Sequence, residues 1–405
     1  MKFCETLRYS LREKYFPGRI TAERKICVHL YNLCHLCAKN NHPNGNPLPY
    51  GMNENSQLIC VLLHISFNTD IMSRLKEKTA VIGGGSWATA IVKILTSNLS
   101  TVGWWVREPE IEEGIKKKGR NPLYLRPVLL NKKQIQISTN LKEIVSEADT
   151  IILAVPSAYI YGTLSTLEKK CLQDKNIVSA IKGIVPERMQ TVSSYIFNSF
   201  DVPEKRFCVI SGPSHAEEIA SEKLTYLTSG SSDVQLADTV ADLFRNQYVK
   251  VHTSSDMQGI EFSIVLKNIY ALAGGILRGT GAGDNLSAVF NTNCLNEMVH
   301  FIETLFPNTN RNVFTAPYLG DFLVTAYSQY SRNRSFGMMI GQGYSVRAAQ
   351  LEMEMVAEGF HAVRCIHELN LTYKANIPII ETVYRILYEN APLKKETQNI
   401  LNTMK

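Results

Sequence analysis

The chain has 405 residues, of which 45% are hydrophobic and 20% charged, with a formal net charge of +6 at pH 7. This length allows two domains with large cores, and the composition is that of an ordinary globular protein. No block of lysine and arginine is interleaved with aromatic residues, so we expect no nucleic-acid partner. The apolar run at residues 58–67 is too short to span a bilayer, so we expect no stable membrane insertion.

Residues 1–75 differ from the rest of the chain because they contain basic residues but no lasting periodicity. Residues 40–47 have loop composition, and no apolar core of a signal peptide follows the first basic residues. We interpret residues 1–75 as an extension that is disordered or not native. Our hypothesis is that the natural chain starts at Met72, which the mass of the native protein would test.

The nine cysteines do not form a metal-binding pattern. Cys34 and Cys37 have C-x-x-C spacing, with His29 and His42 nearby. A zinc site would need a second matched pair, so we expect no metal. The scattered cysteines after residue 61 are typical of buried thiols in a reducing compartment, which predicts a cytoplasmic protein.

A glycine turn joins an apolar, β-branched strand at residues 79–82 to a helix-forming run at residues 88–95. Gly83, Gly85 and Ala88 give the spacing G-x-G-x-x-A. In a dinucleotide-binding fold these small residues permit the tight turn, the approach of the pyrophosphate and close packing of helix on strand. The alternative is an ordinary turn, but the flanking strand and helix favour a nucleotide site.

The predicted second strand, at residues 101–107, ends in Arg107. This position lies about 20 residues beyond the glycines, where a dinucleotide fold contacts the adenosine ribose. Arg107 could hold the 2′-phosphate of NADPH, or it could be a solvated residue at a strand end. Because Glu108 follows it, NAD also stays open.

Further buried strands are predicted at residues 148–157, 177–183, 207–211, 224–228 and 248–253. Ligands of such sheets bind beyond the carboxyl ends of the strands. Lys182, Gly212 and Ser214 fall at that edge.

From about residue 255 helical patterns replace strand patterns, so we predict a first domain at residues 76–254 and a second at 255–405. One buried helix is expected at residues 260–277, with Lys267 in the middle. A lysine there must snorkel, pair or lose its proton, and the loss would make it an acid–base candidate. Later helices are predicted at residues 348–369 and 379–388.

Two polar clusters follow this helix. One contains Gly320 and Asp321. The other comprises Ser331, Arg332, Asn333 and Arg334, whose paired donors could bind a phosphate. The alternative for the second cluster is a solvated loop.

From about residue 78 to 390 the chain resembles the bacterial-type NAD(P)-dependent glycerol-3-phosphate dehydrogenases. The resemblance rests on motifs at residues 83–90, 181–183, 211–218, 266–268, 320–321, 331–334 and 356–359. It implies an α/β Rossmann-type dinucleotide-binding domain followed by an all-α domain, an architecture like that of 6-phosphogluconate dehydrogenase. It also implies reversible reduction of dihydroxyacetone phosphate to sn-glycerol 3-phosphate, with NADP or NAD as cofactor, in support of phospholipid synthesis.

The resemblance assigns roles to individual residues. Lys267 is implied to be the catalytic proton donor and acceptor. The cofactor is implied to contact Gly83, Gly85, Ser86, Trp87, Arg107, Lys182, Ala216, Arg332 and Glu358. The substrate is implied to contact Lys182, Gly212, Ser214, Lys267, Asp321, Ser331, Arg332 and Asn333.

The chain departs from the family pattern at Asn293, where many members carry arginine, and at residues 308–318. Two other functions stay open: another reductase of the same architecture, such as a hydroxy-acid or ketopantoate type, and a non-catalytic NADPH-binding protein. The presence of Lys182 and Lys267 argues against an inactive relative. The architecture is compatible with a homodimer.

Overall fold

The computed structural model describes residues 78–307, 311–353 and 357–404. The expectations for residues 1–75, including the start at Met72 and the C-x-x-C pattern, lie outside the described residues. So does Val356, the first residue of the last family motif.

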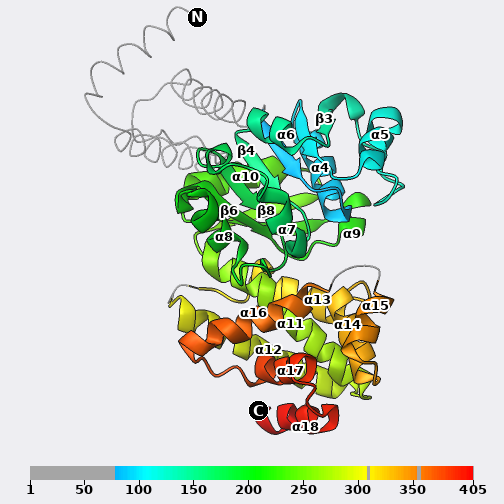
Figure 1. The fold of residues 1–405 in the computed structure, drawn as a ribbon, viewed down its shortest axis with the longest axis vertical. Coiled ribbons are helices and arrows are strands. Elements are labelled where there is room, and N and C mark those ends of the chain that lie inside the picture. The colour runs from blue at the N-terminus through cyan, green and yellow to red at the C-terminus, as the bar shows by residue number, and fades with distance from the viewer. Residues whose placement is uncertain (1–77, 308–310, 354–356, 405) are drawn as a thin grey trace, which may run out of the picture. The chain divides into compact units, whose positions relative to one another are not determined.

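The first part of the described chain is an eight-stranded sheet surrounded by helices (Figure 1). The strand order is β3-β2-β1-β4-β5-β6-β7-β8. Strands β1 to β6 are parallel, β7 runs antiparallel to β6, and β8 runs parallel to β7. The strands are β1 Thr79–Ile82, β2 Val102–Trp105, β3 Ile135–Ser138, β4 Thr150–Leu153, β5 Asn176–Ser179, β6 Phe207–Ser211, β7 Thr225–Gly230 and β8 Val249–Ser254.

Apolar side chains from both faces of the sheet enter hydrophobic cores. In β1, Ala80 and Ile82 belong to one core and Val81 to the other, because successive residues of a strand point to opposite faces. The helices of this part are α4 Ser86–Asn98, α5 Pro109–Lys118, α6 Leu141–Glu147, α7 Ser157–Leu164, α8 Val192–Phe200, α9 Ala216–Ala220 and α10 Val234–Phe244. The predicted α/β class with buried parallel strands is confirmed.

Strand β3 was missed by the sequence analysis. It has four residues at the edge of the sheet, with Ile135 and Ile137 buried and Gln136 exposed between them. Alternation over four residues is too short a pattern to separate from a loop.

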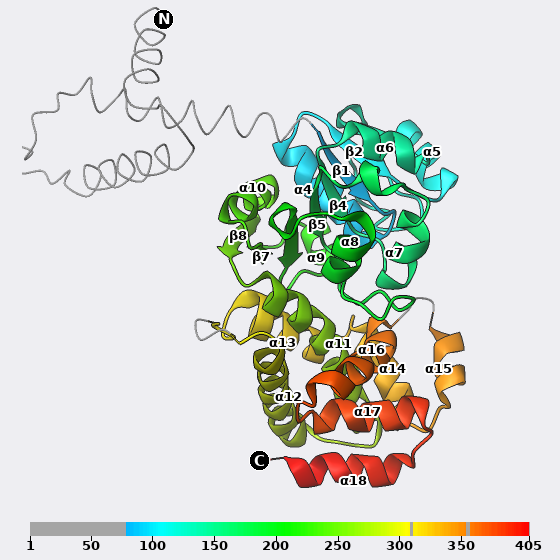
Figure 2. The same cartoon turned by 60° about the vertical axis from the view of Figure 1, so that its left-hand side comes forward.

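The second part of the described chain is helical. Figure 2 shows α11 flanked by α12 and α16. Its helices are α11 Met257–Gly279, α12 Asp284–Leu305, α13 Asp321–Tyr327, α14 Arg332–Gly341, α15 Val346–Glu352, α16 Glu358–Tyr373, α17 Pro378–Tyr388 and α18 Leu393–Thr403, with a π-helical turn, η4, at Ala316–Gly320. The predicted all-α character is confirmed.

Helix α11 forms the core of this helical part. Among the described residues it is the one helix long and apolar enough to cross a membrane, but 94% of its most apolar window is buried inside the protein. The prediction of one buried helix around Lys267 is confirmed, with three further residues at the N-terminal end and two at the C-terminal end.

The prediction of a single helix at residues 348–369 is wrong. Helix α15 ends at Glu352 and α16 begins at Glu358, while Met353 and Ala357 have extended backbones. The intervening sequence contains neither glycine nor proline, so no local signal marks the break.

Helices α11 and α14 pack with their backbones in contact. A Cβ atom on Gly275 would collide with the carbonyl oxygen of Arg334, and one on Gly337 would collide with that of Leu272. A Cβ atom on Gly274, by contrast, would lie at an ordinary 3.5 Å from Cε1 of Phe290. The close approach of the two helices therefore depends on particular glycines, and neighbouring glycines provide controls.

We expect Gly275→Ala to lower the free energy of unfolding by about 1–3 kcal/mol, because the added methyl group forces α14 away from α11. Gly274→Ala should leave that free energy unchanged or raise it by up to about 1 kcal/mol, because alanine favours the helix. Urea-induced unfolding of both variants measures the difference. Equal effects would contradict the packing described here.

Candidate active site

The glycine turn after β1 has a conformation that only glycine adopts easily. Gly83 has φ +136°, and a Cβ atom there would lie 2.6 Å from the carbonyl oxygen of Ala154. Gly85 precedes α4, and a Cβ atom there would meet nothing within 4 Å. Ala88 is fully buried. The turn is therefore tight at its first glycine and open at Gly85.

Three consecutive carbonyl oxygens of this turn accept hydrogen bonds from side chains. Gly83 accepts from Nε1 of Trp104 (2.6 Å), Gly84 from Nδ2 of Asn121 (2.9 Å) and Gly85 from Oγ1 of Thr89 (2.9 Å). No side chain caps the start of α4, so the N–H groups of its first turn lack intrahelical partners. An uncapped helix start beside open space fits a dinucleotide pyrophosphate.

Other residues assigned to the cofactor lie at the carboxyl ends of the strands. Trp87, on the first turn of α4 next to Ser86, donates from Nε1 to the carbonyl of Ala180 (2.9 Å). Nζ of Lys182 lies 5.8 Å from the Trp87 ring centroid. Ala216 begins α9 and is buried. Arg107 follows β2, with 69% of its side chain exposed.

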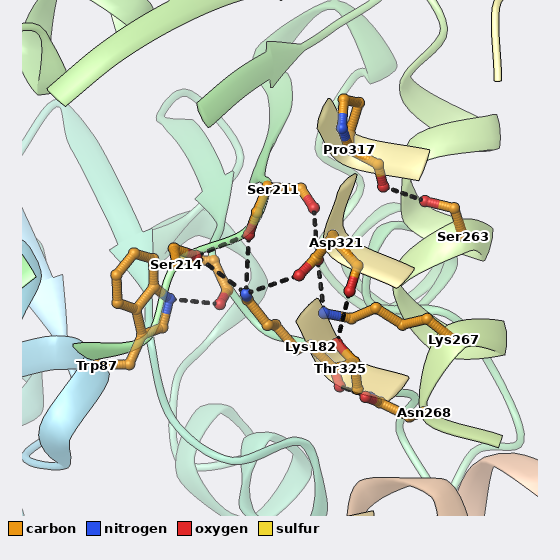
Figure 3. Close-up of polar contacts among 12 residues, drawn as sticks. Trp87, Lys182, Ser211, Ser214, Ser263, Lys267, Asn268, Pro317, Asp321 and Thr325 are labelled. Atoms are coloured by element: carbon orange, nitrogen blue, oxygen red, sulfur yellow. Dashed lines mark hydrogen bonds and ion pairs between the residues drawn. The ribbon is translucent and has the colours of Figure 1, made fainter. Parts of the chain in front are cut away.

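The centre of the candidate site is an ion pair between α11 and α13 (Figure 3). Nζ of Lys267 lies 2.5 Å from Oδ2 of Asp321, and the two side chains are 4% and 1% exposed. Burial lowers the pKa of Lys267 from 10.5 to about 7, Asp321 opposes this shift, and nearby Lys182 adds to it. Lys267 is thus a buried amine that can both donate and accept a proton near neutral pH.

Lys182 approaches the same carboxylate from the loop after β5 (Figure 3). Its Nζ lies 3.6 Å from Oδ1 of Asp321 and donates to Oγ of Ser214 (3.0 Å) and to the carbonyl of Gly212 (3.2 Å). Among the described residues, Oδ1 of Asp321 has no hydrogen-bond partner. The structure thus brings together five residues that the sequence analysis assigned to the substrate, counting Lys267.

One row of polar residues, which starts at the N-cap of α11 and continues along the helix, contacts the segment that leads into α13. Asp256, Ser263 and Lys267 are spaced by seven and four residues, which places them on one side of the helix. Asp256 accepts from the hydroxyl of Tyr318, Ser263 donates to the carbonyl of Pro317 (2.9 Å), and Lys267 pairs with Asp321 (2.5 Å). These contacts hold η4 and the start of α13 against α11.

A second row contacts the sheet-containing part. Glu261 accepts from the backbone N–H of Ser193 (2.8 Å), and Nδ2 of Asn268 donates to the carbonyl of Lys182 (2.7 Å). Glu261 and Asn268 are again seven residues apart. The first row fixes Lys267 beside Asp321, and the second fixes the backbone of Lys182 through Asn268. Together they set the relative positions of the two lysines.

The segment that departs from the family pattern contains Arg311, whose side chain is 1% exposed. Its Nε lies 2.6 Å from Oδ2 of Asp256, and its Nη1 lies 2.5 Å from Oε1 of Glu303. Asn293, the other departure, donates to the carbonyl of Val289 on its own helix (2.9 Å). Arg311 thus supports the N-terminal end of α11.

The four residues of the second polar cluster do not point to one place. Ser331 caps α14 by accepting from the N–H of Arg334 (3.3 Å), and Oδ1 of Asn333 accepts from the N–H of Gly359 (2.8 Å). Arg332 is exposed, whereas Arg334 lines a separate small cavity. Residues two apart on a helix do not share a face, so the two arginines are not brought together for one phosphate.

Glu358 begins α16 and contacts the start of α7 and the loop after β5. It accepts from the backbone N–H of Ser157 (3.1 Å) and from its hydroxyl, and it lies against Gly183. Burial raises the pKa of Glu358, while Ser157 and the charge of Arg332 oppose the shift. Arg332 and Glu358, both assigned to the cofactor, thus lie near each other.

The sequence matches the family described as NAD-dependent glycerol-3-phosphate dehydrogenase, with the N-terminal part at residues 78–237 and the C-terminal part at residues 256–398. The chain belongs to this family. A relative from Oceanobacillus iheyensis named glycerol-3-phosphate dehydrogenase (NAD(P)+) is 34% identical over 80% of this chain and 94% of its own. A relative of the same name from Agathobacter rectalis is 35% identical over 80% of this chain and 96% of its own.

Solved structures agree with this family assignment. A glycerol-3-phosphate dehydrogenase from Coxiella burnetii has a TM-score of 0.73 and 26% identity over 80% of this chain and 99% of its own. One from Saccharomyces cerevisiae has a TM-score of 0.69 and 26% identity with the same coverage of both chains. The predicted family is confirmed.

The sequence analysis missed Asn121, Ser157 and Ser211. Ser211 donates to Oδ2 of Asp321 (3.4 Å). Asn121 is fully buried, and besides binding Gly84 it donates to Oγ1 of Thr89 (2.9 Å). Asn121 lies in a segment without periodicity, whereas Ser157 begins α7 and Ser211 ends β6. Ser211 is part of the family motif at residues 211–218, but the sequence does not show that its hydroxyl faces Asp321.

We expect Asn121→Ala to lower the free energy of unfolding by about 1–3 kcal/mol, because it leaves the part-buried carbonyl of Gly84 and the buried hydroxyl of Thr89 without this donor. Asn376→Ala is the control, since Asn376 is exposed, and should change that free energy by less than about 0.5 kcal/mol. Chemical unfolding compares the two. A loss no greater than the control's would show that the turn does not need this donor.

Proposed function

We propose that this protein catalyses the reversible NAD(P)H-dependent reduction of dihydroxyacetone phosphate to sn-glycerol 3-phosphate. The observation that carries the proposal is the buried Lys267 beside Asp321 and Lys182, at the carboxyl edge of a dinucleotide-type sheet. The relatives named for this activity support it over their nearly complete length. A cytoplasmic location, a role in phospholipid synthesis and a homodimeric state stay predictions.

The proposed cofactor site begins at the glycine turn. Gly83, Gly85 and the first turn of α4 with Ser86 would hold the pyrophosphate, because N–H groups and open space meet there. Ligand contacts further along this edge are proposed for Trp87, Arg107, Lys182, Ala216, Arg332 and Glu358. The bound nicotinamide would supply the hydride for C2 of the substrate.

The protein's own part in the reaction is proton transfer and charge stabilisation. Protonated Lys267 stabilises the negative charge that develops on the C2 oxygen and then gives that oxygen its proton. In the reverse direction neutral Lys267 accepts the proton from the hydroxyl group. Lys182 adds a second positive charge at the same carboxylate, and Oδ1 of Asp321 is left to accept from a ligand hydroxyl.

The phosphate group is proposed to bind near the start of α14. Arg332 supplies the exposed guanidinium there, with Ser331 and Asn333 as its neighbours. Gly212 and Ser214 border the site from the loop after β6. Holding the phosphate away from C2 helps to orient the carbonyl toward Lys267.

The direct test is oxidation of NADPH or NADH by dihydroxyacetone phosphate, followed by absorbance. We expect turnover with the wild type and a loss of at least about 100-fold in kcat for Lys267→Ala, because the proton donor is gone. Lys250→Ala, at an exposed position of β8, should keep wild-type kcat. If folded wild-type protein binds nucleotide without turning over this substrate, the proposal is wrong and a related reductase is favoured.

The pH dependence should follow Lys267. Reduction needs the protonated amine, so kcat should fall as the pH rises through about 7, the pKa of Lys267, whereas oxidation should accelerate. Asp321 raises this pKa, so Asp321→Asn should move the alkaline limb of the reductive profile to lower pH. A variant that loses activity but keeps the wild-type limb would rule out this electrostatic role for Asp321.

A further inference from the structure

The carboxylate of Glu108 lies between Arg107 and the glycine turn. Its Oε1 accepts from Nη2 of Arg107 (2.6 Å) and from Nε (2.9 Å). Its Oε2 would lie 3.3 Å from a Cβ atom added to Gly84. The side chain is 28% exposed, compared with 69% for Arg107. Glu108 is thus the residue of the pair that lies against the turn.

Local structure accounts for this arrangement. Glu108 occupies the N-cap position of α5, and Pro109 begins that helix. Strand β2 pairs in parallel with β1, and the N–H of Gly83 donates to the carbonyl of Trp105 (3.0 Å), so the segment after β2 lies beside the glycine turn. The guanidinium of Arg107 instead lies over the Tyr159 ring, 5.7 Å from its centroid. Both oxygens of the carboxylate therefore have a defined environment before any ligand binds.

In dinucleotide folds an acidic side chain after the second strand accepts hydrogen bonds from the adenosine ribose hydroxyls. A carboxylate against the glycine turn is placed for that contact. A 2′-phosphate at the same place would put roughly two negative charges next to the carboxylate. The repulsion between these like charges strongly disfavours binding. Arg107 could offset this only partly, because Glu108 already holds its guanidinium.

We propose that Glu108 is a specificity-determining residue that favours the dinucleotide without a 2′-phosphate, NADH, over NADPH. This inference rests on the proposed function, because it concerns the adenosine end of the proposed cofactor site. In this arrangement Glu108 accepts hydrogen bonds from the ribose hydroxyls. Arg107 partly offsets the negative charge of Glu108 but is not the main contact of the ribose.

Direct binding separates this inference from the reaction. The dissociation constants of NADH and NADPH are measured by titration calorimetry for the full chain without substrate. We expect the wild type to bind NADH more tightly. Glu108→Gln should tighten NADPH binding about tenfold or more and weaken NADH binding by a few-fold, which reverses or abolishes the preference.

The matched control is Glu112→Gln. Glu112 lies one turn further along α5 and pairs with Lys116 (2.5 Å), so it tests the removal of a negative charge from the same helix. Both dissociation constants should stay at the wild-type values. Arg107→Ala in the wild-type background should leave NADH preferred, whereas in the Glu108→Gln background it should remove the gained NADPH affinity.

A wild type that prefers NADPH, or a Glu108→Gln variant with an unchanged ratio of dissociation constants, would overturn the inference. Binding with the expected preference but without turnover of dihydroxyacetone phosphate would leave the inference standing and refute the proposed reaction. Folded wild-type protein that binds neither nucleotide would refute both.

Discussion

The cost of burying the ammonium group of Lys267 organises the site. An ammonium group in an apolar helix is strongly disfavoured unless a counter-charge is near. Asp321 supplies that charge, and it is itself shared with Lys182. One carboxylate from α13 thus serves one lysine on α11 and another on the loop after β5. Burial and Lys182 lower the pKa of Lys267 while Asp321 raises it, so all three segments together set its value.

Helix α11 meets this requirement because it carries two polar rows within an otherwise apolar surface. One row faces η4 and α13, and the other faces residues of the sheet-containing part. The opposite side packs against α14 through glycines that allow backbone contact. The same helix is therefore the centre of the hydrophobic core and the support of the proposed proton donor. This double role explains why a helix of such low polarity contains a buried Lys, Glu and Asn.

Much of the fold could be predicted from the sequence, because its signals are local. The β-branched run before Gly83, the buried strands and the apolar pattern around Lys267 are each contained in one short continuous segment of the sequence. What escaped prediction depends on contacts between distant residues. Glu358 binds Ser157 across 201 positions, and the end of α15 at Glu352 has no glycine or proline after it to mark it. Strand β3 is defined mainly by its pairing with β2.

The residues of the site also divide into those with a local signal in the sequence and those defined only by contacts in the fold. Lys182, Gly212 and Ser214 were found because strand ends are recognisable and parallel strands bring their carboxyl ends to one edge. The separation of Arg332 from Arg334 follows from the helix that begins at Arg332, which the composition of the cluster did not reveal. Asn121 holds the glycine turn from a loop without periodicity. Such supporting residues are chosen by geometry and leave little trace in the sequence.

The seven-residue spacing of the contacts on α11 also limits how the gene can change. Insertion of one residue between Gly259 and Lys267 would rotate the rest of the helix by about 100° and move it by about 1.5 Å. Lys267 and Asn268 would then leave their partners, although every side chain was still present. Positions of this helix that make none of these contacts can be substituted, but the number of residues between the contacts must stay the same. Insertions and deletions that preserve activity are therefore expected in segments such as the exposed connection between α14 and α15.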